Sequence, residues 1–239
     1  MKIQDSVALV TGANRGLGLA IACELLARGA KKVYAGVRDT SQASTQLSGL
    51  VLVKLDVTDQ DSVATAAAQC RDVSLLVNNA GIAKAMESIL DPALIESARE
   101  IFETNFYGLI RMTQAFAPLI CAKTGGAIVN VLSDANWFSR PMLSPYSASK
   151  SAAWSFTNAL RVEMREKGTQ VLDLHVGFMN TDMTMGSGLK KPSAEEVATR
   201  TLDALESGKQ EVVGDEGTKG IKQGLSTDLP PDLNLSPFG

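Results

Sequence analysis

A tyrosine and a lysine four residues apart, Tyr146 and Lys150, have the residue types and the spacing for proton transfer. Pro145 suits the first position of a helix, and the small and apolar residues after it predict that the helix continues. Side chains four residues apart lie on one face of a helix. A nearby ammonium is expected to lower the pKa of the phenol towards the range useful in acid–base catalysis. The alternative is a surface lysine beside a half-buried tyrosine, because this spacing alone is too short a motif to decide.

A glycine-rich turn near the N-terminus could bind the cofactor that such chemistry requires. An apolar strand over 6–10 leads into Thr11-Gly12-Ala13-Asn14-Arg15-Gly16-Leu17-Gly18, and a helical pattern follows over 19–26. Glycines allow a pyrophosphate to approach the backbone, and the helix N-terminus offers free N–H groups. The alternative is a plain glycine-rich turn. The cofactor contacts predicted here are Gly12, Asn14, Arg15, Gly16, Leu17 and Gly18.

The end of the second predicted strand, over 32–37, bears on the choice between NAD and NADP. An NAD site usually has an acidic residue there for the ribose hydroxyl. This chain has Val37 and then Arg38, and Arg15 lies in the glycine turn. Arginines suit a 2′-phosphate, so we predict NADP(H). Asp39 is the residue that opposes this choice, and its alternative role is to cap a helix over 40–47.

Further candidate residues follow the next strands. Asp56 and Val57 end a strand over 50–55, where Asp56 could bond an adenine amino group and Thr58 could cap a helix over 59–70. A strand over 73–77 leads into Asn79, Ala80 and Gly81, at the edge where open α/β sheets bind ligands; a simple asparagine-rich turn is the alternative.

Polar residues in the second half complete the candidate site. Asn105 interrupts a long apolar helical pattern over 91–121, either as a structural hydrogen-bonding residue or in a polar relay. Ser133 ends a strand over 126–132, and Gly177 follows a strand over 170–176 that contains His175. We expect His175 to be structural. Ser193 and Glu196 predict a capping box for a helix over 194–205, and a last strand is expected over 210–213.

The composition indicates one soluble α/β domain over 1–239, with a substrate loop over 177–192 and a polar tail over 226–239. The chain is 45% apolar with a net charge of −3, which argues against nucleic-acid and membrane partners. No apolar run approaches the roughly 18 residues of a membrane span. Three widely spaced cysteines, no metal-ligand spacing and no signal peptide favour a reducing compartment, and we expect a cytoplasmic location.

Together, these motifs resemble the short-chain dehydrogenase/reductase family in order and spacing, over residues 7–213. The resemblance implies a doubly wound parallel sheet of about seven strands with helices on both faces, a nicotinamide cofactor, and a homodimer or homotetramer. It implies that Tyr146 is the general acid or base and that Lys150 holds the nicotinamide ribose. Ser133 would bond the substrate oxygen, and Asn105 would hold a water beside Lys150.

The resemblance also indicates a substrate region after the sixth strand. Thr181 would contact the cofactor carboxamide, with Gly177 and Met179 nearby. An apolar lining is expected from Trp137, Met142, Phe178, Met179, Met183 and Met185, each of which could equally be core. No arginine or lysine clearly faces the substrate side, although Lys84 and Arg140 are candidates. A neutral ketone, aldehyde or secondary alcohol is therefore favoured over a highly anionic substrate. The alternatives are a 3-oxoacyl-thioester reductase, which would need a basic patch, and a non-catalytic NADP(H) sensor, which would not need Tyr146.

Overall fold

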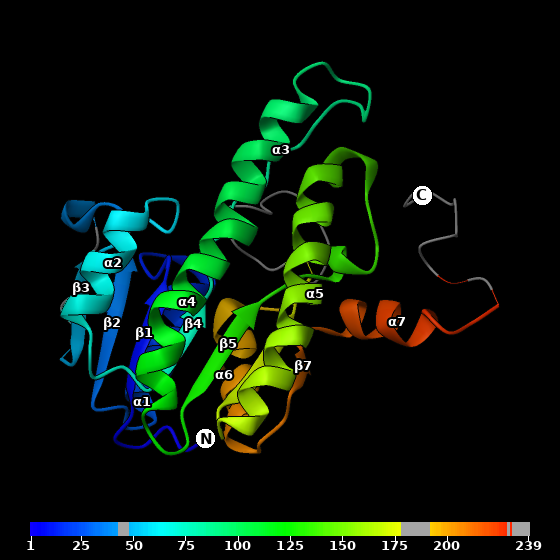
Figure 1. Ribbon diagram of the computed structural model, residues 1–239. Coiled ribbons are helices and arrows are strands. Elements are labelled where there is room, and N and C mark those ends of the chain that lie inside the picture. Colours follow the sequence, from blue (N-terminus) through cyan, green and yellow to red (C-terminus); the bar gives the residue numbers. More distant parts are fainter. Residues whose placement is uncertain (43–47, 178–191, 229, 231–239) are drawn as a thin grey trace.

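Seven parallel strands form one sheet in the order β3-β2-β1-β4-β5-β6-β7 (Figure 1). The computed structural model describes residues 1–42, 48–177, 192–228 and 230. The strands are β1 (Val7–Thr11), β2 (Lys32–Val37), β3 (Leu50–Lys54), β4 (Leu75–Asn78), β5 (Ala127–Val131), β6 (Gln170–His175) and β7 (Glu211–Val213). The strand order reverses between β1 and β4, which is where a doubly wound sheet opens a crevice at the carboxyl ends of its strands.

Helices cover both faces of the sheet, as the sequence predicted. The helices are α1 (Gly16–Ala27), α2 (Gln60–Gln69), α3 (Leu94–Phe102), α4 (Gly108–Cys121), α5 (Ser144–Glu166), α6 (Ala194–Glu206) and α7 (Glu216–Gly224). One face packs against α1 and α6, and the other packs against α2, α4 and α5 (Figure 1). The end of α3 stands beyond the sheet, above the carboxyl ends of the strands.

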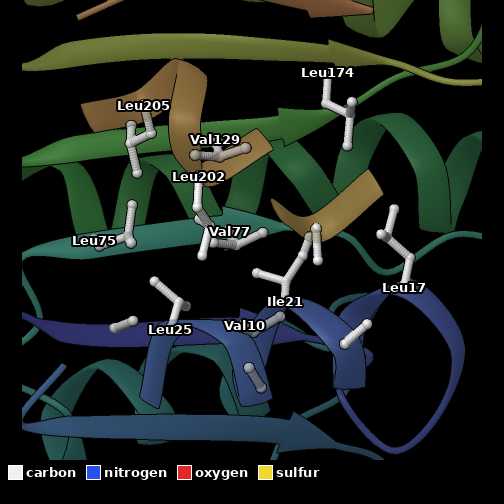
Figure 2. Packing of buried hydrophobic residues seen from close by; sticks show 14 of the residues in the cluster. Val10, Leu17, Ile21, Leu25, Leu75, Val77, Val129, Leu174, Leu202 and Leu205 are labelled. Carbon is white, nitrogen blue, oxygen red and sulfur yellow. The ribbon is translucent and has the colours of Figure 1, made fainter. Parts of the chain in front are cut away.

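The strands are apolar on both sides because both faces of the sheet are buried. Along β1, Ala8 and Val10 belong to the core beneath α1 and α6, whereas Val7 and Leu9 belong to the core on the opposite face. This alternation follows from the two-residue period of a strand. Figure 2 shows the first core, where Ile21 of α1 and Leu202 of α6 lie among side chains from the sheet.

Two local expectations are wrong. Thr58 does not cap α2, because the Asp59 carboxylate accepts the N–H groups of Asp61 and Ser62 at 2.9 and 3.3 Å. The long pattern over 91–121 is not one regular helix either. A π-helical turn, η2 (Glu103–Tyr107), separates α3 from α4.

Two further helical segments bear on the expectations. The sequence did not reveal α7, whose N-terminus is capped by Asp215. The predicted helix over 40–47 begins as the short 3-10 turn η1 (Thr40–Gln42), in which Asp39 accepts the Ser41 N–H, and its remainder lies outside the described residues. Within the described part of the chain, no helix is both long and apolar enough to cross a bilayer.

Candidate active site

A cavity of about 1030 Å³ lies along the carboxyl ends of the strands, at the point where their order reverses. Its size is at the upper end of the range for ligand sites, about 300–1,000 Å³. The wall contains most of the predicted cofactor contacts, namely Gly12, Asn14, Arg15, Gly16, Leu17, Gly18, Arg38, Asp56, Val57, Asn79, Ala80, Gly81 and Gly177, together with Tyr146 and Lys150. Because Val131 and Leu132 at the end of β5 also line the cavity, residues from six strand ends and from α5 meet in one place.

The glycine turn leaves no room for side chains where its backbone meets Asn79. A Cβ at Gly18 would lie 2.5 Å from both the Asn79 Nδ2 and the Gly12 carbonyl oxygen. Asn79 Nδ2 donates to the Thr11 carbonyl at 2.9 Å and so ties the end of β4 to the turn. Gly12 has a φ of +66°, which side-chain-bearing residues rarely adopt. With the N-terminus of α1 opening into the cavity, the turn fits a dinucleotide pyrophosphate.

Charged residues from the glycine turn and from the ends of β2 and β3 also lie on the cavity wall. Arg15 and Arg38 are exposed on its wall, and so is Asp39. Asp56 accepts hydrogen bonds from the Thr58 N–H and hydroxyl at 2.9 and 2.7 Å. Burial acts to raise the pKa of Asp56, but these bonds and the Arg38 charge outweigh it and lower the pKa. Asp56 is therefore a carboxylate near neutral pH, able to accept an adenine N–H.

Tyr146 and Lys150 lie one turn apart on α5, and both face the cavity. Lys150 is 5% exposed, and its ammonium donates to the Val131 carbonyl at 2.9 Å. Burial lowers the pKa of Lys150 to about 8. Its Nζ is 5.7 Å from the centre of the Tyr146 ring. The pair can therefore supply a phenol and an ammonium to one bound molecule.

The expected lowering of the Tyr146 pKa is not found. Burial raises the pKa of this phenol; hydrogen bonding with Ser133 acts to lower it, the Asp134 charge raises it further, and the Arg140 charge lowers it. The Lys150 ammonium points instead to the Val131 carbonyl. Tyr146 is therefore a protonated phenol near neutral pH, the form that an acid needs.

Asn105 lies in the π-helical turn and is 2% exposed. Its Oδ1 accepts the Ile82 N–H at 2.8 Å, and its Nδ2 donates to the Ile82 carbonyl and the Ser149 hydroxyl at 2.9 and 3.1 Å. The side chain thus joins the segment after Gly81 to α5. These hydrogen bonds supply the partners that a buried asparagine amide requires. π-turns inside helices often occur at functional sites.

Ser133 is buried at the end of β5, where it caps the short 3-10 turn η3 (Asp134–Asn136). Its hydroxyl donates to Asp134 Oδ1 at 3.0 Å and accepts the Ala135 N–H at 3.2 Å. Arg140 Nη2 in turn pairs with Asp134 Oδ2 at 2.7 Å. The candidate catalytic serine therefore has a buried ion pair directly behind it. Asp134 follows Ser133 directly, but as one acidic residue in a loop it carried no sequence signal.

His175 is fully buried, in agreement with the structural role expected for it. Its Nδ1 lies 3.0 Å from Asn136 Oδ1, an oxygen that also accepts the Ser133 N–H at 3.2 Å. Its ring stacks on Trp137 with centroids 4.0 Å apart. Histidine and η3 are therefore one packed unit behind the site.

The predicted substrate residues are only partly accounted for. Trp137 packs between His175 and Trp154, and Met142 is 59% exposed; the described wall of the cavity includes neither of them. Phe178, Met179, Thr181, Met183 and Met185 lie outside the described residues. The cavity wall includes the apolar residues Ile82, Leu132 and Val176 instead, which the sequence pattern gave no reason to select.

The sequence and the fold of this chain were compared with those of known proteins. The family model described as short chain dehydrogenase matches residues 6–192, so the chain belongs to the short-chain dehydrogenase/reductase family. It is an oxidoreductase of that family, which uses a nicotinamide cofactor and small-molecule substrates.

Three similar proteins illustrate the relationship. A short chain dehydrogenase from Burkholderia cenocepacia, solved in complex with NADP, is 38% identical with a TM-score of 0.90, over 95% of each chain. Dehydrogenase/reductase SDR family member 7B of Mus musculus is 31% identical over 88% of this chain and 73% of its own. The 3-oxoacyl-(acyl-carrier-protein) reductase FabG of Vibrio cholerae is 32% identical over 87% and 85% of the two chains.

Proposed function

We propose that this protein is an NADPH-dependent oxidoreductase that interconverts ketones and secondary alcohols. The observation that carries the proposal is the position of Tyr146 and Lys150, side by side on the wall of the cavity into which the glycine turn opens. A bound nicotinamide would supply or accept the hydride. The protein's own part is to hold the cofactor and substrate and to transfer the proton.

Tyr146 is the proposed proton donor in reduction and the proton acceptor in oxidation. During reduction, negative charge develops on the substrate oxygen, and a donor aimed at that oxygen stabilises the transition state. The Ser133 hydroxyl is the second proposed group at that oxygen. Lys150, with its ammonium buried at the cavity wall, is proposed to bind the hydroxyls of the nicotinamide ribose.

Asn105 is proposed to hold a water molecule beside Lys150. A second cavity of about 10 Å³ is lined by both residues and by Asn78, whose buried Oδ1 has no hydrogen-bond partner among the described residues. That volume is about the size that one water requires. A water there would link the ammonium of Lys150 to the asparagine.

The preference for NADPH is supported by Arg15 and Arg38 on the cavity wall. Guanidinium groups recognise phosphate through paired hydrogen bonds, so both could contact a 2′-phosphate. The NADP complex of the Burkholderia relative also supports this choice. Asp39, exposed at the same end of the cavity, would instead suit the hydroxyl of NAD.

The proposed substrate is neutral, bulky and apolar. Both candidate cations have acidic partners: Lys84 forms an ion pair with Glu100, and Arg140 forms one with Asp134. Apolar residues on the cavity wall, among them Ile82 and Leu132, also suit such a substrate. The alternative, a 3-oxoacyl-thioester reductase, is supported by the similarity to FabG; reduction of acetoacetyl-CoA in place of simple ketones would favour it.

The assembly proposed is a homodimer or homotetramer formed through α3, α4 and α5. Apolar side chains are exposed along these elements and the turn between α3 and α4, including Ile95 at 63%, Tyr107 at 48% and Val162 at 65%. Exposed apolar groups of this kind favour protein interfaces when they are contiguous. A cytoplasmic location remains part of the proposal, and the free thiols of Cys23, Cys70 and Cys121 support a reducing compartment.

The test compares the wild-type protein with Tyr146→Phe for oxidation of NADPH and NADH with a panel of aromatic and bulky aliphatic ketones. We expect turnover with NADPH preferred, and loss of nearly all turnover in the variant with NADPH affinity retained. Tyr107→Phe, at an exposed position, is the matched control and should remain active. Substantial activity in Tyr146→Phe would contradict the mechanism, and NADPH binding without turnover would favour the sensor alternative.

A further inference from the structure

The Ser133 hydroxyl has one proton and two neighbouring acceptors. It donates to the Asp134 carboxylate at 3.0 Å. A hydrogen bond from the same hydroxyl would stabilise the phenolate form of Tyr146, since Ser133 acts to lower the pKa of that phenol. One proton cannot serve both acceptors fully. Whatever holds it on the Asp134 side therefore withholds it from Tyr146.

Asp134 is held in place by an ion pair that is itself largely buried. The Asp134 and Arg140 side chains are 7% and 14% exposed, and their closest atoms are 2.7 Å apart. The Arg140 guanidinium also lies over the Phe138 ring, 5.1 Å from its centre. Gly177 completes the enclosure, since a Cβ there would lie 3.3 Å from Asp134 Oδ2. Both charges act at close range and with little screening by water.

We propose that Asp134 and Arg140 form a positioning pair, which sets the direction in which Ser133 donates its proton and thereby decides how readily Tyr146 loses its own. This inference rests on the proposed function of Tyr146 as the acid or base. Asp134 attracts the serine proton, and Arg140 limits that attraction by neutralising the carboxylate. The two charges also act directly on Tyr146 in opposite senses: Asp134 raises the pKa of the phenol and Arg140 lowers it.

Other charged groups around Tyr146 are few among the described residues. Lys150 is on the same helix, with its ammonium on the Val131 carbonyl. Asp215 lies beyond Gly177, and its carboxylate accepts the Gly177 N–H and the Thr218 hydroxyl.

The acidic side chains of α3 and of the π-helical turn, which pack against α5, form ion pairs with other residues. Glu103 of the π-helical turn pairs with Arg111, and Glu100 of α3 pairs with Lys84. Glu96 of α3 pairs with Arg99 of the same helix, and both are exposed. From β6, Asp173 pairs with Arg161 of α5, and His175 faces Asn136 of η3. Asp134, which accepts the Ser133 hydroxyl directly, and its partner Arg140 are therefore the charges best placed to act on Ser133 and Tyr146.

The consequence for catalysis differs between the two directions. Reduction uses the protonated phenol, which Asp134 favours. Oxidation of an alcohol uses the phenolate, which Asp134 disfavours and Arg140 favours. The pair should therefore determine how far the pH must rise before alcohol oxidation becomes fast.

Two substitutions change one charge each with little change of shape. Asp134→Asn removes the negative charge, and its amide can donate to Ser133, which frees the serine proton for Tyr146. The pKa of Tyr146 should fall. Arg140→Gln leaves the Asp134 charge without its counter-ion, so the pKa of Tyr146 should rise. Opposite shifts distinguish an electrostatic role from a purely structural one, which would disturb the site in the same way in both variants.

The direct readout is the ultraviolet absorbance of the Tyr146 phenolate during a pH titration. The chain has three tyrosines, so subtracting the titration of the same variant carrying Tyr146→Phe isolates the one of interest. If Arg140→Gln fails to fold with an unpaired buried carboxylate, Asp134→Asn with Arg140→Gln in one chain replaces it. That double variant has neither charge and should titrate above Asp134→Asn alone. Glu163→Gln and Lys167→Gln are matched controls that should leave the titration unchanged; the two residues form an exposed ion pair at the C-terminal end of α5.

The second readout is the pH dependence of alcohol oxidation, whose acidic limb should move to lower pH in Asp134→Asn and to higher pH in Arg140→Gln. Shifts in the same direction, or none, would overturn the proposed pair even if the enzyme reduces ketones as expected. Opposite titration shifts in a protein that turns over no carbonyl compound would retain the pair and refute the proposed function instead.

Discussion

Replacing Lys150 with methionine should stabilise the folded protein while removing its catalytic function. The lysine stem is buried, and methionine can fill most of the same space without an ammonium. Burial lowers the pKa of Lys150 from 10.5 to about 8. Because each pKa unit corresponds to about 1.4 kcal/mol, the buried charge opposes folding by roughly 3 kcal/mol at pH 7.

Part of this gain is offset by a lost hydrogen bond. Without the ammonium, the Val131 carbonyl loses its 2.9 Å partner, which costs about 1–2 kcal/mol. We therefore expect Lys150→Met to be more stable than the wild type by about 1–2 kcal/mol at pH 7. It should bind NADPH more weakly and have almost no turnover.

The sign of the pH dependence follows from the direction of the pKa change. Since the folded-state pKa lies below the unfolded one, the unfolded chain holds the extra proton between about pH 8 and 10.5. The free energy of unfolding of the wild type should therefore rise with pH across this window, relative to the variant. From pH 7 to 9.5, the cost of the lysine should fall by about 2 kcal/mol.

The assay is urea denaturation of both proteins without cofactor, at pH 7 and at pH 9.5, and at one fixed protein concentration because association would also stabilise the fold. Lys167→Met, at an exposed lysine directly after the end of the same helix, is the matched control. A Lys150→Met protein that is less stable than the wild type at pH 7, with a stability difference independent of pH, would refute the reasoning.

Three other substitutions test separate parts of the site. Arg38→Ala should weaken NADPH binding roughly 10- to 100-fold, because a hydrogen bond to a charged group contributes about 1.5–3 kcal/mol. NADH binding should be nearly unchanged, and equal losses of affinity for the two cofactors in a binding titration would contradict the 2′-phosphate assignment. Gly18→Ala should weaken both dinucleotides by at least about tenfold, because its methyl would lie 2.5 Å from the Gly12 carbonyl; unchanged affinities would show that the turn does not bind the cofactor. Ser133→Ala should lower kcat about a hundredfold with a smaller change in KM, as expected for a lost transition-state donor, and an effect on KM alone would limit Ser133 to substrate binding.

The strands, and the side-by-side position of Tyr146 and Lys150, were predictable because their signals are local. A strand buried on both faces is apolar throughout, so β2 was predicted at its observed bounds and the other six within a residue or two. The glycine turn could be identified from three glycines that follow a strand pattern and precede a helical one. Tyr146 and Lys150 share a face through helical spacing alone, so their proximity required no knowledge of the rest of the chain.

Errors arose where the outcome depends on competition between neighbouring residues. Thr58 and Asp59 are both good N-cap types, and only the path of the chain after β3 decides that Asp59 takes the free N–H groups. The π-helical turn at Asn105 could not be predicted either, because the spacing of apolar residues typical of a helix continues on both sides of it. The π-helical turn differs from an α-helical turn only in bonding residues five apart instead of four, and this difference leaves no mark on the types of residue in the segment.

The sequence by itself determined the α/β pattern of strands and helices, the glycine turn between a strand and a helix, and the tyrosine–lysine pair, because each depends on periodicity or spacing within a short segment. The tertiary structure alone decided that Asn105 joins Ile82 to Ser149, that His175 packs against the turn after Ser133, and that Asp134 lies between the Ser133 hydroxyl and Arg140. These contacts, and the burial that sets the pKa values of Tyr146 and Lys150, depend on which chain segments exclude water together. That exclusion is a property of the folded chain and is not encoded in any one segment.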